Sequence, residues 1–219
     1  MLFYEKLQTV PLFQGLTGDD LLQIIGQTRF QFGKSAPGSV IAGEGSLCHG
    51  LTTITDGQAA AITCAADHGY SVEEHVKAPY TLQPESLFGL SPHYTRTFTA
   101  ITTCDTVTIC KDDLLRISDE FIIFRLNLIN SLSALSQKYA RQLWHPSPTD
   151  TRGRLAAFIK ARCTTPTGSK TVRIKMTRLA QELGCGRLAV SAALNAMQDD
   201  GRLSFSRGII SVPRLEELD

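Results

Sequence analysis

Side chains that can bind phosphates and the polar edges of nucleic-acid bases gather between positions 175 and 207 of this 219-residue chain. An arginine can donate two hydrogen bonds to a guanine, and amide, hydroxyl and methyl groups can contact other base edges. Lysine and arginine also attract the phosphate backbone. The residues expected to contact DNA are Lys175, Thr177, Arg178, Arg187, Leu188, Ser191, Ala192, Asn195 and Arg207.

The residues from Thr177 to Met197 have the spacing of two short helices that cross around a tight turn. Thr177 is expected to cap the first helix. Ala180 is small enough for a close helix crossing, and Gly184 suits a helix end that needs a positive φ angle. This spacing predicts a helix-turn-helix whose second helix runs from Arg187 to Met197. The shared core is expected to come from Leu183, Val190 and Leu194.

The charge of the chain is divided unevenly. Residues 1–150 hold 10 Lys and Arg against 15 Asp and Glu, whereas residues 151–219 hold 12 against 6. Such asymmetry indicates a basic module that meets a polyanion. Residues 171–176 alternate as a half-buried strand, and residues 203–212 predict a hairpin with Arg207 and Gly208 at its tip. We therefore expect a winged helix-turn-helix in residues 146–219, the alternative being a helical packing module with a solvated basic face.

Short β-rich runs separated by Gly, Pro, Asp and Ser occupy residues 31–117. They are expected at 39–42, 51–55, 58–63, 97–102 and 106–109, with a turn at Asp56-Gly57. Runs at this spacing predict an antiparallel β-roll or barrel. A helix is expected before them, from Thr17 to Gln27, because it has a capping Thr and an acidic first turn. The chain is thus expected to be α+β, with a β-roll in residues 1–118.

A helical period begins after Ser118 and is expected to continue to residue 145. Its later apolar residues are three or four positions apart, nearly the spacing of a coiled coil. Pro146 and Pro148 end the helix because proline lacks a backbone donor, and we place a hinge there. The helix can join two chains, pack on its own β-domain, or do both with different faces. The residues assigned to a dimer helix are Phe121, Phe124, Leu128, Leu132, Leu135 and Tyr139.

The chain resembles the Crp/Fnr family of bacterial transcription regulators over nearly its whole length. The resemblance rests on Pro11-Leu-Phe-Gln-Gly-Leu-Thr, on the glycines of the β-rich region, on the long helix and on the stretch from Leu179 to Ser191. It implies a cyclic-nucleotide-binding-like β-roll, a dimerisation helix and a C-terminal winged helix-turn-helix. It also implies a homodimer that binds double-stranded DNA at a palindrome-like site and works with RNA polymerase.

The start of the expected recognition helix departs from the family. Members often have Ser-Arg-Glu-Thr where this chain has Gly186-Arg-Leu-Ala, so only the arginine of a base-reading pair is kept. Arg187 is expected to contact a guanine, the alternatives being a phosphate contact or solvent exposure. Leu188 offers only an apolar contact, such as one to a thymine methyl group. The operator sequence is left open.

The expected effector pocket departs as well. Nucleotide-binding members use a Gly-Glu-Leu turn for the ribose and an Arg-Ser or Arg-Thr pair for the cyclic phosphate. This chain lacks the glycine before Glu85, so the sequence does not favour a cyclic nucleotide. The structural alternative for Glu85 is a turn acid, and that for Arg96 is a surface or strand-start cation. The residues assigned to this pocket are Glu85, Ser86, Arg96 and Thr97.

Other functions find less support. The six cysteines form no Cys-x-x-Cys pair and the five histidines no paired spacing, so no metal site is predicted, and the cofactor stays open because a single His or Cys can still hold haem. No leader or long apolar run is present, so we expect a cytoplasmic protein without a membrane partner. No catalytic motif appears, so no enzyme is expected. The alternative function is a ligand-binding regulatory module that acts through protein or RNA partners without specific duplex DNA binding.

Overall fold

The computed structural model describes residues 3–144 and 148–218, which divide into two compact units. The first unit holds residues up to 60 and residues 76–141, and the second holds residues 61–75 and those from 142 onward. The chain therefore passes between the units three times. We call residues 61–75 the hairpin. The expected borders at 118 and 145 stay a prediction, and the expected hinge at residues 144–148 falls mostly on residues 145–147, which lie outside the described residues.

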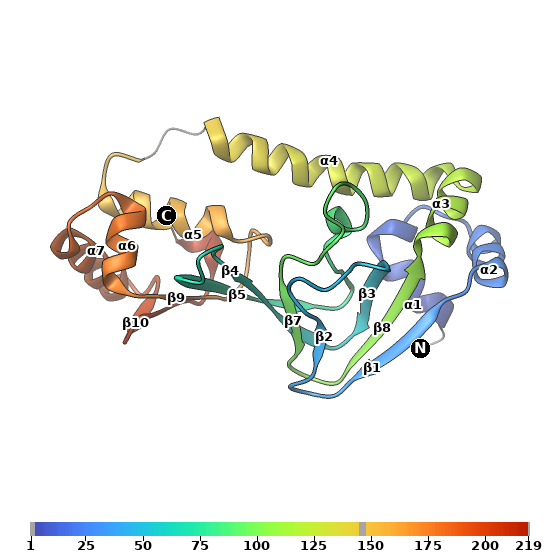
Figure 1. Ribbon diagram of the computed structural model, residues 1–219, viewed down its shortest axis with the longest axis horizontal. Coiled ribbons are helices and arrows are strands. Elements are labelled where there is room, and N and C mark those ends of the chain that lie inside the picture. The colour runs from blue at the N-terminus through green and yellow to red at the C-terminus, as the bar shows by residue number, and fades with distance from the viewer. Residues whose placement is uncertain (1–2, 145–147, 219) are drawn as a thin grey trace. The chain divides into compact units, whose positions relative to one another are not determined.

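The first unit combines helices with antiparallel strands (Figure 1). Its helices are α1 (Phe3–Thr9), η1 (Pro11–Phe13), α2 (Gly18–Gln27), η2 (Pro84–Ser86), α3 (Lys111–Glu120) and most of α4 (Ile122–Trp144). Its strands are β1 (Gln31–Ser35), β2 (Val40–Ala42), β3 (Gly50–Asp56), β6 (Tyr80–Thr81), β7 (Thr97–Ala100) and β8 (Cys104–Cys110). Two further strands, β4 (Gln58–Cys64) and β5 (Tyr70–Lys77), begin or end in this unit and continue into the hairpin.

The strands of the first unit form the expected antiparallel β-roll. One sheet has the order β1-β8-β3-β6, and β2 pairs with β7. Strand β8 lies between β1 and β3, with Val107 opposite both Phe32 and Thr53. The core is apolar and includes Leu7, Leu21, Ile24, Leu51, Ile54, Phe98, Val107, Leu114, Ile117 and Phe124.

The second unit contains a complete winged helix. Its elements are α5 (Thr151–Arg162), β9 (Lys170–Ile174), α6 (Met176–Leu183), α7 (Arg187–Asp199), β10 (Ser204–Ser206), β11 (Ile209–Val212) and η3 (Leu215–Glu217). Strand β9 lies between β11 and β5, and all these pairings are antiparallel. The α+β fold predicted from the sequence is thus confirmed.

Local signals explain the first of these helices. The backbone N–H of Asp20 donates to Thr17 Oγ1 over 3.2 Å, and the Thr17 N–H donates to the Asp20 carboxylate over 2.9 Å. This reciprocal cap satisfies two backbone donors that the first turn leaves open. The helix predicted from Thr17 to Gln27 is confirmed, with Thr17 as its cap.

The helical region after the β-roll begins earlier than predicted and is broken once. The sequence predicted that this region starts after Ser118. In the structure, α3 begins at Lys111, directly after β8, with Asp112 and Asp113 in its first turn. Acidic residues favour a helix N-terminus. The predicted start rested on the spacing of apolar residues and did not take these two aspartates into account. Phe121 is extended, with φ −118° and ψ 97°, and separates α3 from α4.

The turn between β3 and β4 depends on Gly57. Its φ angle is +97°, and a Cβ atom there would overlap the carbonyl oxygen of Thr103. We expect Gly57→Ala to lower the free energy of unfolding by about 1–3 kcal/mol, measured by urea denaturation. Gly26→Ala is the matched control, since nothing lies within 4 Å of a Cβ atom there and its φ is helical. A loss at Gly26 as large as that at Gly57 would contradict this account.

Candidate nucleic-acid interface

Helices α6 and α7 form the predicted helix-turn-helix. Gly184 ends α6 in the left-handed region, with φ +60°, and the Cys185 N–H donates to the Ala180 carbonyl over 3.0 Å. These bonds close the helix end where the chain turns. The side chains expected in the shared core are buried, namely Ala180, Leu183, Val190 and Leu194.

The start of α6 differs from the prediction. The helix begins at Met176, and Lys175 occupies the cap position without a side-chain hydrogen bond. Thr177 lies in the first turn and is exposed. Because β9 ends at Ile174, the chain enters the helix two residues earlier than a cap at Thr177 requires. The prediction that Thr177 caps the helix is wrong.

The exposed face of α7 carries the five side chains expected to meet base edges. Arg187, Leu188, Ala192 and Asn195 are exposed and Ser191 is half-buried, while Val190, Leu194 and Met197 on the opposite face are buried. Leu188 is 88% exposed, which is unusual for a large apolar side chain. Gly186 precedes the helix and supplies no side-chain cap for its first turn.

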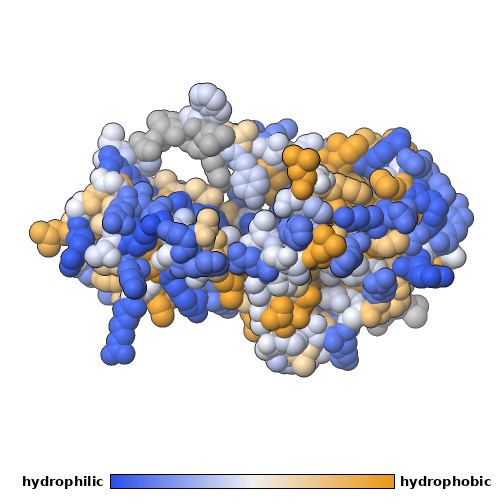
Figure 2. All heavy atoms as spheres, in the orientation of Figure 1, coloured by the Kyte–Doolittle hydropathy of each residue, from blue (hydrophilic) through white to orange (hydrophobic). Residues whose placement is uncertain are grey.

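Two further expected contacts, Lys175 and Arg207, lie outside α7. Arg207 and Gly208 both have positive φ angles, 48° and 81°, as the two-residue turn of the wing requires. A hydrophilic side chain projects from the wing tip in Figure 2, and Arg207 is exposed. Lys175 and Arg207 line a shallow hollow of about 340 Å³ together with Arg173 and His68.

Arg178 is engaged in ion pairs within the second unit. Its guanidinium lies 2.9 Å from the Asp67 carboxylate and 2.9 Å from that of Glu182. The ring of Tyr70 lies 5.9 Å from the guanidinium carbon. Two carboxylates therefore compensate the charge of Arg178, and one of them comes from the hairpin.

The hairpin is packed into the winged helix as an additional strand. Strand β5 pairs with β9 over five residues, with Val72 opposite Val172. Both valines are buried in one apolar core with residues of α5, α6 and α7. The pairing leaves β9 with a neighbour on each side, so its backbone presents no open edge.

A buried ion pair joins the same two strands. Glu74 and Lys170 lie opposite each other, their charged atoms are 3.0 Å apart, and their side chains are 1% and 0% exposed. The backbone N–H and hydroxyl groups of Thr164 and Thr165 donate to the Glu74 carboxylate over 2.6–3.0 Å. Lys170 also donates to the Thr165 hydroxyl. Each buried charge thus has an opposite charge and further hydrogen bonds.

These contacts set the protonation of Glu74. Burial alone raises the pKa of Glu74, but the hydrogen bonds from Thr164 and Thr165 and the charge of Lys170 outweigh burial and lower the pKa to about 2. Because the folded pKa is below the ordinary value of 4.5, the pair stabilises the fold above that pH. The stabilisation is lost as the pH falls toward 2.

The pair was not predicted, although the sequence contains a signal for it. Glu74 is in phase with Val72 and Val76 along one strand, and Lys170 is in phase with Val172 along another. A charged residue at the inward phase of a strand needs an opposite charge. Two such residues of opposite charge, each on the inward face of a strand, therefore indicate a buried ion pair.

The residues assigned to an effector pocket lie on two neighbouring segments of the first unit. Glu85 is exposed in η2, whereas Ser86 and Arg96 are buried. The Gln83 side chain joins the segments by donating to Thr95 Oγ1 over 2.7 Å and accepting from the Thr95 N–H over 3.1 Å. Thr97 begins β7, and its hydroxyl accepts from the Glu44 N–H. Their role in binding an effector stays a prediction.

The residues assigned to a dimer helix divide into two groups. Phe121, Phe124 and Leu128 are buried within the first unit. Leu132 and Leu135 are half-buried, and Tyr139 is exposed. The first group packs on its own β-roll, and only the second group has surface left for another chain.

Two further observations concern the described residues alone. No group of three or more His, Cys, Asp or Glu side chains there is placed to hold a metal ion. Within the same ranges, every helix is too short or too polar to cross a membrane.

The chain thus joins a β-roll, a long helix and a winged helix in this order. No family model and no curated protein sequence matches the chain. Among solved structures, CprK in complex with OCPA matches with a TM-score of 0.51 and 14% identity over 90% of this chain and 91% of that chain. The catabolite activator protein of Thermus thermophilus gives a TM-score of 0.48 and 19% identity over 95% and 97%. DNR of Pseudomonas aeruginosa gives 0.47 and 17% over 100% and 98%. The chain has the fold of the Crp/Fnr regulators, as its sequence predicted.

The buried pair allows a direct test on the second unit. Glu74→Gln leaves the Lys170 ammonium buried without an opposite charge, and we expect it to lower the free energy of unfolding by about 3–5 kcal/mol. The matched control is Arg173→Gln, which breaks the more exposed pair of Glu73 and Arg173 on the same two strands. This control is expected to cost less than about 1 kcal/mol. Urea denaturation followed by circular dichroism measures both, and equal losses would refute the special role of the buried pair.

Proposed function

We propose that this chain is a cytoplasmic transcription regulator that binds double-stranded DNA as a homodimer. The observation that carries the proposal is the exposed face of α7, which holds Arg187, Ser191 and Asn195 within a complete helix-turn-helix. A helix of this kind fits the major groove, where guanidinium, hydroxyl and amide groups distinguish base pairs. RNA polymerase is the downstream partner in this proposal.

The charges around α7 support the same partner. Lys175 before α6 and Arg207 at the wing tip are exposed and line the same shallow hollow. Phosphates beside the groove can accept their hydrogen bonds, which positions the helix without reading sequence. Arg187 is proposed to read a guanine and Leu188 to contact a thymine methyl group. Arg178 is left out, because Asp67 and Glu182 already bind it.

The proposed dimer uses the part of α4 that its own β-roll does not cover. Ile129 and Tyr139 are 50% and 42% exposed, and Leu132 between them is half-buried. The spacing along this face is four, three, four and three residues, as in a two-helix seam. It runs through Arg125, Ile129, Leu132, Ser136 and Tyr139. A polar Ser136 inside such a seam also fixes the register between the helices. A second copy of α4 is therefore the proposed occupant of this face.

The β-roll is proposed to receive the signal. Helix α4 begins in the first unit, with Phe124 fully buried there, and its later residues carry the proposed seam. A ligand that binds one packing of this helix better than another shifts the population toward that packing. The distance between two winged helices, and hence their fit to two half-sites, would change with it.

DNA reading is tested by selecting duplexes with the purified chain at two salt concentrations. We expect one enriched palindrome-like sequence, and Arg187→Ala is expected to weaken its binding about 10- to 100-fold and relax the preference at one base pair. Arg207→Ala should weaken all duplexes alike and reduce the salt slope by about 1. Arg214→Ala is the control, since Arg214 pairs with Glu217 on the surface. If no duplex is enriched, the alternative of a ligand-binding module without specific DNA binding replaces this proposal.

The seam is tested by analytical ultracentrifugation. Ile129→Glu combined with Leu132→Glu places like charges in the proposed interface, and we expect monomers at concentrations where the unchanged chain is dimeric. Leu22→Glu is the control, because Leu22 is an exposed apolar residue on α2, outside the proposed seam. A dimer that survives the double substitution would rule out this face.

A further inference from the structure

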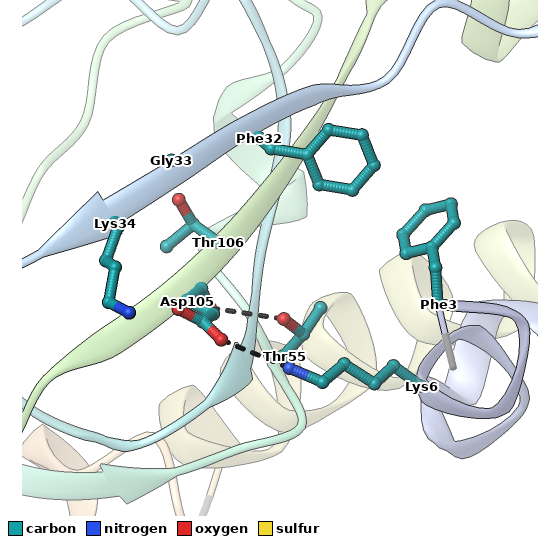
Figure 3. Close-up of a pocket in the computed structure, with 8 residues that line it drawn as sticks. All are labelled: Phe3, Lys6, Phe32, Gly33, Lys34, Thr55, Asp105 and Thr106. Atoms are coloured by element: carbon teal, nitrogen blue, oxygen red, sulfur yellow. Dashed lines mark hydrogen bonds and ion pairs between the residues drawn. The ribbon is translucent and has the colours of Figure 1, made fainter. Parts of the chain in front are cut away.

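A hollow of about 380 Å³ lies between α1 and the sheet of the first unit, over β1 and β8 (Figure 3). Its volume falls within the range of about 300–1,000 Å³ that is usual for small-molecule sites. Eight residues line it: Phe3, Lys6, Phe32, Gly33, Lys34, Thr55, Asp105 and Thr106. None of them belongs to the effector pocket assigned from the sequence.

One side of the hollow is aromatic. Phe3 of α1 and Phe32 of β1 meet edge to face, with ring centroids 4.8 Å apart, and Phe30 packs against Phe3 in the same manner at 5.1 Å. Phe32 is nevertheless 67% exposed. Its ring has one aromatic neighbour in the hollow and an open face, which suits stacking by a third ring.

The opposite side is polar. Figure 3 shows Lys34, Asp105, Thr55 and the ammonium of Lys6 there, away from the two rings. Lys6 is already engaged, because its ammonium lies 3.1 Å from Asp105 and 3.9 Å from Asp56. Thr55 donates to the Asp105 carbonyl oxygen. The polar groups other than Lys34 are thus largely satisfied within the fold.

Lys34 is the available cation. It follows Phe32 by two residues, so both side chains lie on the same face of β1, and it is directly opposite Asp105 in the register. Among residues 3–144 and 148–218, no hydrogen bond or ion pair engages its ammonium. One available cation matches one negative charge on a ligand.

We infer that this hollow binds a small planar aromatic molecule with one negative charge, such as an aromatic carboxylate. The ring stacks on Phe32 and Phe3, and the carboxylate accepts from the Lys34 ammonium. Both contacts come from the first unit alone, so the inference does not depend on the proposed DNA binding. It gives the β-roll a ligand site on its helix-covered side, apart from Glu85 and Arg96.

The test uses the full chain and three probes of related shape in isothermal titration calorimetry. We expect 2-naphthoate to bind with saturation, and 2-naphthalenemethanol and cyclohexanecarboxylate to bind at least about tenfold more weakly, since each lacks one of the two recognised features. No saturation by 2-naphthoate at millimolar concentration overturns the inference. Equal affinity for the uncharged alcohol overturns it as well.

Two variants assign the binding to this hollow. Lys34→Met removes the charge and keeps the stem, and Phe32→Ser removes the ring from an exposed position, so each is expected to weaken 2-naphthoate about tenfold while leaving the melting temperature nearly unchanged. The matched controls are Lys77→Met, an exposed lysine in β5, and Val40→Ser, an exposed apolar residue in β2. Binding that is unaffected by both hollow variants, or weakened as much by the controls, places the ligand elsewhere and refutes the site.

Discussion

The ion pair between Glu74 and Lys170 is the interaction on which the second unit depends. Two charges have been removed from water, at a cost of several kcal/mol each, and the fold offsets this only while Thr164 and Thr165 keep the carboxylate hydrogen-bonded. The pair fixes β9 beside β5, and β9 runs directly into α6. The orientation of the helix-turn-helix within its unit therefore follows from a contact with a segment almost a hundred residues earlier in the chain.

The parts that could be predicted from the sequence are those with local causes. Gly184 and the Arg207-Gly208 turn require positive φ angles, and alternation or helical period fixes which side chains around them are buried. The β-roll was predictable for the same reason, through its turns. The pairing of β5 with β9 was not predicted, because neither segment contains a local signal that identifies the strand it pairs with. The inward position of Glu74 and of Lys170 indicated only that each charge needs an opposite charge.

The candidate sites divide in the same way. The exposed face of α7 follows from helical spacing, so Arg187 and Asn195 were placed correctly on it. Arg178 is an arginine like Arg187 and belongs to the same helix-turn-helix. However, Asp67 of the hairpin binds Arg178, a contact that only the tertiary fold reveals. The hollow beside Phe32 is likewise assembled from α1 and two strands far apart in the chain. On α4, the period identified the apolar residues but could not divide them between the β-roll and another chain.

The three passages of the chain between the units bear on how such proteins can be recombined. A winged helix made only of residues after α4 would be severed from the strand that completes its sheet. Lys170 would be left as a lone charge in an apolar interior, and the flank of β9 would be open to strands of other molecules. Exchange of whole units between proteins of this fold by a single cut is therefore not neutral for this chain. An exchange that preserves the protein has to carry the hairpin with the winged helix or supply a new partner for that lysine.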